Sequence, residues 1–406
     1  MHTIPINTEE NSLEILGGKG RSLAKMTRSG FRVPDGFIVT ADAYRDFVST
    51  CGIQEEIIEL AKPDLKNGYP NFEECSKKIQ LIIESNQTPE STRNEIIEAY
   101  EGLSGTALRM AVRSSANAED LPEFSFAGQQ ETFLNISTSA AIIESVHKCW
   151  ASLWTPQAIS YRHQNGIDQS SVAMAVVVQK MIPSEVSGIL FTANPSSGER
   201  SQIILNSSFG LGEAVVSGQV TPDTFIVDRQ TLNINEKILG PKEQKIVSED
   251  GQGVRIESTN AEERTQSSLS DEQIKELVKN SLQIESIYSG QPQDIEWAFC
   301  NGELHLLQSR PITNLPAQPI EVEWKPTPPA RFVSRRQIVE NMPEPICPLF
   351  EELYLTRGLE APRKKSLMAG GGPMFVTVNG YAYQRFDWPG IIKEAEERKK
   401  RKEDVR

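Results

Sequence analysis

Apolar and polar side chains alternate along residues 293–311, and this pattern predicts a β-hairpin. Asn301-Gly302, between the two runs, is typical of a tight turn. The second arm is apolar over residues 304–307 and ends in Gln308 and Arg310. The first arm places three large apolar side chains on one face and two carboxylates on the other: Ile295, Trp297 and Phe299, then Asp294 and Glu296.

The length of the turn decides which face carries the polar end of the second arm. A two-residue turn pairs residues whose numbers sum to an odd value, which puts Glu296 and Gln308 on opposite faces. A three-residue turn, with Gly302 as a left-handed bulge residue, puts them together. A shared site needs the second register. The apolar pattern slightly favours the first, because the leucines of the second arm then join the apolar face of the first arm.

Periodicity elsewhere predicts mixed helices and strands. Residues 52–102 have a helical, polar-faced pattern with breaks near Pro63, Pro70 and Pro89. The nearly continuous apolar run at 171–183 predicts a buried strand. The other segments divide into a glycine loop feeding a helix at 14–30, helices at 138–153, 155–165 and 270–288, strands at 108–115, 127–136, 187–193, 201–208 and 223–228, and a hairpin or surface excursion at 241–270.

Composition and charge narrow the class of protein. A net charge of −13 and a pI near 5.1 argue against a general nucleic-acid binder. No apolar run approaches the roughly 18 residues that a membrane span needs, and the N-terminus lacks a signal-peptide pattern. Five scattered cysteines, with no Cys-x-x-Cys, predict reduced thiols in a cytoplasmic protein. The four histidines never cluster, so a Cys/His metal site is not expected.

The polar end of the predicted hairpin suits a metal ion beside a polyphosphate. Asp294, Glu296 and Gln308 supply hard oxygen atoms of the kind that hold Mg²⁺. The guanidinium fork of Arg310 matches phosphate. An ordinary hairpin with a polar edge is the alternative interpretation of this stretch alone.

A lysine and an arginine are further phosphate candidates. Lys19 lies among three glycines at 17–20, so its ammonium is open to a ligand, although Gly20 stands where a Walker A loop has Ser or Thr. Arg113 ends a predicted strand opposite the loop Gly128–Thr132, where a guanidinium and free amides would surround phosphates. A solvated lysine and a structural arginine are the alternatives.

Two other segments bear on a nucleotide site. The exit of the buried strand, Gln179 to Met181, offers backbone groups to a purine edge. Residues 210–215 contain only Gly-x-Gly-x-x-Val, so the dinucleotide fingerprint fails and a Rossmann site is disfavoured.

Motifs spread over about residues 10–313 agree in order and spacing with one known family. They are Gly-Gly-Lys-Gly at 17–20, Ala-Val-Arg-Ser-Ser-Ala at 111–116, Glu-Asp-Leu-Pro at 119–122, Phe-Ala-Gly-Gln-Gln-Glu-Thr-Phe-Leu at 126–134, Val-Gln-Lys-Met at 178–181, Gly-Leu-Gly-Glu at 210–213, Asp-Ile-Glu-Trp at 294–297 and Gln-Ser-Arg-Pro at 308–311. Together they resemble the nucleotide-binding part of the pyruvate phosphate dikinase and phosphoenolpyruvate synthase superfamily. Residues 191–195, 213–218 and 341–345 look more like rifampicin phosphotransferases than phosphoenolpyruvate synthases.

The resemblance implies an α+β fold of the ATP-grasp type, in which two α+β subdomains clamp ATP. We expect the first subdomain at residues 1–180 and the second, with the metal-site hairpin, at 181–313. A proline-rich linker is expected at 314–329, and the beginning of an acceptor-substrate domain at 330–406.

The resemblance also assigns roles, with ATP and Mg²⁺ as cofactors. Arg113 and Arg310 hold phosphates at the transferring group and are the expected catalytic residues. Nucleotide-binding residues are expected at Lys19, Arg113, Gly128, Thr132, Gln179, Met181, Glu213 and Arg310. Glu296 and Gln308 are expected to bind Mg²⁺.

One departure from the family concerns histidine. Family members pass phosphate through a histidine in a glycine-rich segment, and none of His2, His147, His163 and His305 lies in such a segment. We therefore expect a separate histidine-bearing domain or subunit to complete transfer to a small-molecule acceptor, such as an antibiotic hydroxyl or pyruvate. The alternatives are a non-catalytic ATP-binding module and one half of a split phosphoenolpyruvate synthase-like enzyme.

Overall fold

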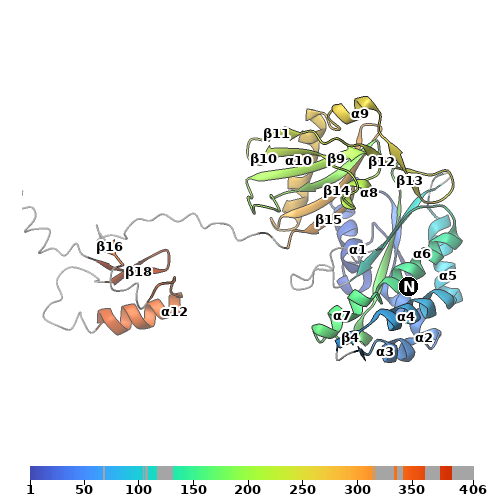
Figure 1. Cartoon of the computed structure of the whole chain (residues 1–406), viewed down its shortest axis with the longest axis horizontal. Coiled ribbons are helices and arrows are strands. Elements are labelled where there is room, and N and C mark those ends of the chain that lie inside the picture. Colours follow the sequence, from blue (N-terminus) through green and yellow to red (C-terminus); the bar gives the residue numbers. More distant parts are fainter. Residues whose placement is uncertain are drawn as a thin grey trace, which may run out of the picture. The chain divides into compact units, whose positions relative to one another are not determined.

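The computed structural model describes residues 1–66, 69–103, 105, 108–116, 131–313, 315, 333–335, 342–361 and 375–385. The chain divides into two compact units, Met1–Ala317 and Gln318–Arg406. Figure 1 shows the helices and strands of both units.

Helices and strands are mixed throughout the first unit, as the α+β prediction requires. The helical segments are α1 (Leu13–Arg28), α2 (Ala41–Thr50), α3 (Gln54–Leu60), α4 (Glu73–Ser85), α5 (Glu90–Glu101), α6 (Ser139–Ser152), α7 (Pro156–Gln164), the 3₁₀ turn η1 (Gln169–Ser171), α8 (Glu213–Val216), α9 (Ala261–Thr265) and α10 (Asp271–Ile287). The strands are β1 (Thr3–Pro5), β2 (Gly36–Val39), β3 (Asp64–Lys66), β4 (Tyr69–Asn71), β5 (Met110–Ala116), β6 (Thr132–Ile136), β7 (Met174–Lys180), β8 (Val186–Phe191), β9 (Gln202–Phe209), β10 (Asp223–Asp228), β11 (Ile234–Ile238), β12 (Gln244–Ser248), β13 (Val254–Ser258), β14 (Gln293–Cys300) and β15 (Glu303–Pro311).

An antiparallel sheet in the order β1-β2-β7-β5-β6 forms the first lobe, the part of the chain up to Lys180. Its central strand β7 is buried at every residue except Lys180, as the apolar run predicts. Helices α1, α2 and α6 pack against β7. The predicted helices at 138–153 and 155–165 are present as α6 and α7.

A second antiparallel sheet, in the order β11-β10-β9-β8-β14-β15, forms the second lobe, from Val186 to Pro311. Helix α10, which matches the predicted helix at 270–288, packs against β14. The apolar core runs continuously through both lobes. Helix α1 joins them, because it contacts β5 and β7 of the first sheet and also β15 of the second (Figure 1).

The β14–β15 hairpin combines the register that buries its apolar residues with the register that places Glu296 beside Gln308. Its turn has two residues, Asn301 and Gly302, both with positive φ (51° and 74°), so of the two turn lengths left open by the sequence the two-residue one, which the apolar pattern favours, is present. Trp297 pairs with Leu306 in the odd-sum register, and the register then shifts so that Glu296 faces Gln308. The extra residue is Leu307, a β-bulge within the strand rather than at the turn.

Residues 244–258 form the two-stranded β12–β13 hairpin, which agrees with the hairpin predicted within 241–270. The edge strand β11 and the short β3–β4 hairpin are present without having been predicted. Within the described residues, no helix is both long and apolar enough to span a bilayer.

The second unit contains a three-stranded sheet and a helical segment. The sheet has the order β16-β18-β17, from β16 (Val333–Ser334), β17 (Phe375–Val378) and β18 (Tyr381–Arg385). The helical segment comprises α12 (Pro348–Phe350) and the π-helix η2 (Glu351–Glu360). Leu355 and Ala382 are buried at the centre of its small apolar cluster.

Candidate nucleotide site

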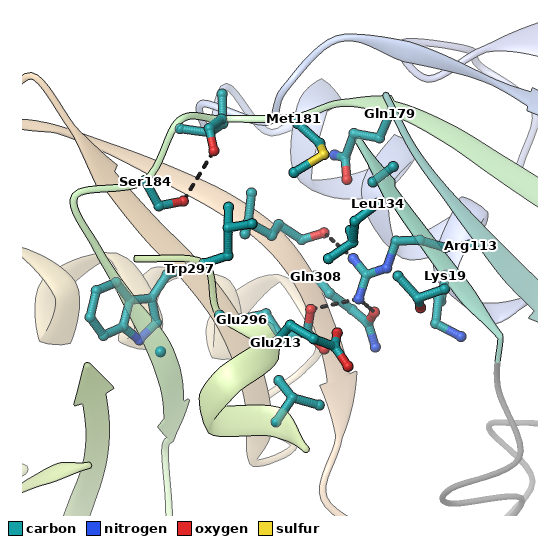
Figure 2. A pocket seen from close by; sticks show the side chains of 18 of the residues that line it. Lys19, Arg113, Leu134, Gln179, Met181, Ser184, Glu213, Glu296, Trp297 and Gln308 are labelled. Atoms are coloured by element: carbon teal, nitrogen blue, oxygen red, sulfur yellow. Dashed lines mark hydrogen bonds and ion pairs between the residues drawn. The ribbon is translucent and has the colours of Figure 1, made fainter. Parts of the chain in front are cut away.

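A cavity of about 530 Å³ is lined by both lobes of the first unit. Its walls come from α1, β5, β6 and β7 on one side and from β8, α8, β14 and β15 on the other. Gly128 lies outside the described residues. Asp294, which the hairpin pattern also proposed as a metal ligand, does not line it. The remaining predicted residues line this cavity, and Figure 2 shows most of them: Lys19, Arg113, Thr132, Gln179, Met181, Glu213, Glu296, Gln308 and Arg310.

Gly17 sets the direction in which α1 presents Lys19. Its φ of 67° lies outside the helical range and breaks α1 after the first turn. A Cβ at this position would lie 1.9 Å from the carbonyl oxygen of Ser115 in β5, so only glycine permits the close approach of helix and strand. Lys19 is buried, and its ammonium donates to the carbonyl oxygen of Ser114 at 2.8 Å.

Arg113 reaches from β5 across the cavity to the β14–β15 hairpin. One terminal nitrogen, Nη2, donates to Glu296 Oε2 at 2.6 Å and to Gln308 Oε1 at 2.7 Å. The other, Nη1, donates to the carbonyl oxygen of Leu307 at 3.3 Å. The bulge therefore supplies a third acceptor to the same guanidinium, and these charge-assisted bonds hold three groups of the second lobe around one residue of the first.

Arg310 lies at the rim of the cavity, about half exposed, and pairs with Asp294 on the adjacent strand. Its Nε and Nη2 donate to Asp294 Oδ2 at 2.9 and 2.8 Å. Burial raises the pKa of Asp294, the Arg310 charge opposes that shift, and Glu296 adds to it. Asp294 thus orients Arg310, whereas the sequence pattern alone had grouped it with the metal ligands.

Glu213, at the first turn of α8, faces Glu296 across the cavity (Figure 2). Burial is the main cause that raises its pKa, and the charge of Glu296 adds to the shift, while Arg113 acts in the opposite direction. The carboxylates of Glu213 and Glu296 therefore repel each other in the absence of a cation between them.

Gln179 and Met181 lie together at another end of the cavity (Figure 2). Gln179 is buried and donates to the carbonyl oxygen of Pro34 at 3.3 Å. The amide of Met181 donates to Arg109 O, and that of Lys180 donates to Asp35 O, each at 2.8 Å. Two of the backbone donors expected to face a purine are thus already used within the first lobe.

Some lining residues belong to motifs of the sequence but were assigned no site role of their own. Leu134 of β6 and Trp297 of β14 line the cavity, yet each belongs to an alternating strand pattern that predicts only burial. Lys180 also lines it and forms an ion pair with Asp35 at 3.2 Å. Only the order of strands in the sheet brings these positions to the same cavity.

The oxygen atoms of Glu296 and Gln308 suit a magnesium ion. Both contact a single nitrogen of Arg113, so they converge on one cationic point. Mg²⁺ in nucleotide sites takes few protein ligands and completes its shell with phosphate oxygens and water. The described residues hold no group of three His, Cys, Asp or Glu that would bind a metal by themselves. This set therefore fits a metal brought with a polyphosphate rather than one held by the protein alone.

Comparison with known families agrees with this geometry. Residues 13–326 match the family described as "Pyruvate phosphate dikinase, AMP/ATP-binding domain". That match covers both lobes and all the predicted site residues.

Named relatives match about three quarters of the chain. A probable phosphoenolpyruvate synthase of Methanocaldococcus jannaschii is 44% identical over 75% of this chain and 26% of its own length. The phosphoenolpyruvate synthase of Pyrococcus furiosus is 41% identical over 75% of this chain and 43% of its own length. The rifampicin phosphotransferase of Streptomyces sviceus is 41% identical over 76% of this chain and 35% of its own length.

The chain thus spans less than half the length of these relatives. Both kinds of phosphotransferase named by the resemblance are among them, at equal or nearly equal identity. The match of residues 13–326, together with the cavity that those residues line, shows that the chain belongs to the family of pyruvate phosphate dikinase AMP/ATP-binding domains.

Proposed function

We propose that this chain binds ATP together with Mg²⁺ as the nucleotide-binding part of a dikinase-type phosphotransferase. One observation carries the proposal: Lys19, Arg113, Glu296, Gln308 and Arg310, distant in sequence, line one cavity. Family membership supports ATP as the nucleotide. These three cations and two oxygen ligands are the kinds of group that bind a triphosphate with its metal.

Lys19, Arg113 and Arg310 would bind the phosphates. Lys19 and Arg113 come from the first lobe and Arg310 from the second, so a triphosphate between them draws the lobes together. Catalysis by such an arrangement is mainly positioning and neutralisation of the charge on the transferring phosphoryl group. Asp294 contributes by fixing the direction of the Arg310 fork.

Glu296 and Gln308 would hold Mg²⁺, with Glu213 across the cavity. When bound there, Mg²⁺ would supply charge neutralisation and orientation to the phosphates. Arg113 Nη2 now lies at the point on which both oxygen atoms converge. We therefore expect Arg113 to exchange these acceptors for phosphate oxygens when the nucleotide binds.

Gln179 and Met181 would border the adenine, and Thr132 with Gly128 would belong to the loop that closes over the phosphates. In this arrangement residues 1–180 and 181–313 are the two ATP-grasp subdomains. Residues 314–329 act as a linker, and residues 330–406 begin the acceptor-substrate domain.

The complete reaction would pass a phosphoryl group through a histidine outside this chain's nucleotide site. Of the four histidines, all within the described residues, none lines the cavity. We propose that a histidine-bearing domain or subunit receives the phosphoryl group and transfers it to a small-molecule acceptor, such as pyruvate or an antibiotic hydroxyl.

Calorimetric titration of the full chain with ATP tests the binding step. We expect one ATP per chain, with an affinity that rises when MgCl₂ is present. Absence of heat from binding in both conditions, with a chain shown to be folded by circular dichroism, would contradict the proposal.

Transfer is tested by adding a separate histidine-bearing fragment from a homologous phosphotransferase and ATP labelled at the β-phosphate. Labelled phosphohistidine on the fragment is expected only when this chain is present. If ATP binds but no label is transferred to any such fragment, the chain is a non-catalytic ATP-binding module.

A further inference from the structure

The β12–β13 hairpin makes a contact with the first lobe that the proposed function does not use. Of its strand residues only Ile246 is buried. An isolated two-stranded hairpin is marginally stable in water, so contacts at its base and its tip must determine its position.

The base of the hairpin is fixed within the second lobe. Lys242 and Asp223 form a fully buried ion pair at 2.5 Å. Asp223 also accepts from the backbone N–H groups of Gly240 and Ser268. The amide of Leu211 donates to the carbonyl oxygen of Ile246 at 2.8 Å, so the hairpin lies beside the segment that leads into α8.

The tip of the hairpin is held by two side chains of the first lobe, Asn135 and Arg109. Asn135 in β6 donates from its single amide nitrogen to the carbonyl oxygens of Glu249 and Gly253, at 2.8 and 2.7 Å. These two residues close the turn, because the amide of Glu249 donates to Gly253 O at 3.2 Å. Arg109 also donates to the carbonyl oxygen of Gly251.

The backbone of Asn135 connects this contact to the cavity. Asn135 is fully buried and has a φ of 61°, in the left-handed region that asparagine tolerates better than most residues. Its N–H donates to the sulfur of Met181 at 2.8 Å. Met181 and the preceding residue of β6, Leu134, both line the cavity, and Met181 also packs against the cluster of Leu211 and Ile246.

We infer that Asn135 is a positioning residue that latches the β12–β13 hairpin of the second lobe to the first lobe, and so fixes the Met181 side of the nucleotide cavity. This inference rests on the proposed function, since it assigns a consequence for ATP binding. A side-chain amide supplies two donors from one nitrogen without adding a charge, which suits two neighbouring carbonyl oxygens.

Asn135→Asp tests the two side-chain hydrogen bonds with the least change in shape. Aspartate has nearly the same shape and tolerates the left-handed backbone, but it has no donor when ionised and places a negative charge against two carbonyl oxygens. We expect the affinity for ATP·Mg²⁺ to fall about tenfold, mainly through faster dissociation, because the two lost bonds hold the closed arrangement.

Shortening the β12–β13 hairpin disrupts the same hydrogen bonds by changing the acceptor side instead of Asn135. Replacing residues 249–253 by Asn-Gly keeps Ser248 paired with Val254 through a two-residue turn. The shorter tip withdraws the carbonyl oxygens that accept from Asn135 and also the one that accepts from Arg109. Asn135→Asp in that background should cause no further loss, because partners in one interaction are not additive. Asn135→Gly serves as a second variant, since it relieves the left-handed backbone and still lacks the amide.

Two quantities are measured. Stopped-flow fluorescence gives the dissociation rate of a fluorescent ATP analogue with Mg²⁺, and hydrogen exchange gives the protection of the backbone amides of residues 244–258. The inference is supported if Asn135→Asp, Asn135→Gly and the shortened hairpin each release the ATP analogue about tenfold faster and exchange hydrogen faster in the hairpin. It also requires that Asn135→Asp in the shortened hairpin add no further effect. Unchanged dissociation in Asn135→Asp, or slower binding without faster exchange at 244–258, overturns the latch. If the unaltered chain binds no ATP analogue, the proposed function fails, and hydrogen exchange alone then decides the latch.

Discussion

Two β-hairpins of the second lobe differ in how they are held: β14–β15 lines the cavity, whereas β12–β13 lies beside the segment that leads into α8. The β14–β15 hairpin forms part of a six-stranded sheet, and Ile295, Trp297 and Phe299 are buried in the core. The β12–β13 hairpin is a separate two-stranded sheet with one buried strand residue, Ile246. The first holds the proposed metal ligands, and the second touches the first lobe through its tip.

From this difference we infer that the fixed geometry of the site and the contact between the lobes depend on different elements. Ligands for a metal and phosphates need fixed geometry, which a packed sheet provides because its side chains are locked by the core. A latch must release, so it depends on a few hydrogen bonds at the end of an exposed hairpin. The following variants test whether the two hairpins are separable in this way.

Lys242→Ala should have the largest effect of these variants, which is a decrease in the free energy of unfolding. It leaves the fully buried carboxylate of Asp223 without its cation, and loss of one partner of a buried pair costs about 3–5 kcal/mol. Denaturant unfolding followed by circular dichroism measures this loss. The combined Asp223→Asn, Lys242→Met variant is the control and should recover much of it. A loss below about 1 kcal/mol would show that the base of the β12–β13 hairpin is not anchored by this pair.

Arg113→Ala should lower the affinity for ATP·Mg²⁺ about a hundredfold, because it removes two charge-assisted contacts to phosphate. The same change should raise the affinity for Mn²⁺ without nucleotide, since the guanidinium no longer occupies the point between Glu296 and Gln308. Calorimetry and Mn²⁺ electron paramagnetic resonance measure the two effects. Equal losses of both affinities would contradict the proposed exchange of partners.

Arg310→Ala should lower the affinity for ATP·Mg²⁺ by at least about tenfold, with little change in fold. Arg310 is about half exposed, and its loss leaves Asp294 with a raised pKa and no cation. Asp294→Asn is the matched control: it frees the Arg310 fork and should weaken binding less than Arg310→Ala does. Unchanged affinity in Arg310→Ala, measured by calorimetry, would refute the phosphate role of Arg310.

Glu213→Gln should have the smallest effect, on the pH dependence of stability. Burial, with Glu296, raises the pKa of Glu213 above its ordinary value of 4.5, so the folded state keeps this proton to higher pH than the unfolded state. The free energy of unfolding contributed by this group therefore falls as pH rises from 4.5 through the folded pKa. Glu213→Gln removes that fall, so its stability relative to the unaltered chain should increase over this interval. A difference that does not vary with pH would contradict the assignment.

Much of the fold could be predicted from local patterns. The apolar run at 171–183, the helical periods at 138–165 and 270–288, and the alternation at 293–311 each report one element, because burial of one face determines the spacing of apolar residues. The site residues came from local patterns and from a resemblance of motifs, and the structure brings the described ones other than Asp294 to one cavity.

Other features depend on contacts that no local pattern encodes. The pairing set by the turn at Asn301-Gly302 differs by one residue from the pairing of Glu296 with Gln308, and the bulge at Leu307 takes up that residue. Neither strand alone reveals where the register shifts. The pairing of Asp294 with Arg310 depends on the strand register, and Asn135 gains its partners only when a hairpin more than a hundred residues away folds against β6.

The central claim is that Glu296 and Gln308 hold a metal beside the phosphates bound by Lys19, Arg113 and Arg310. Calorimetric titration of ATP, with and without Mg²⁺, into the unaltered chain and into Glu296→Gln tests it most directly. We predict that Mg²⁺ increases the ATP affinity of the unaltered chain and that Glu296→Gln loses this increase while its metal-free ATP affinity does not fall. An increase of the same size in both proteins would contradict the account.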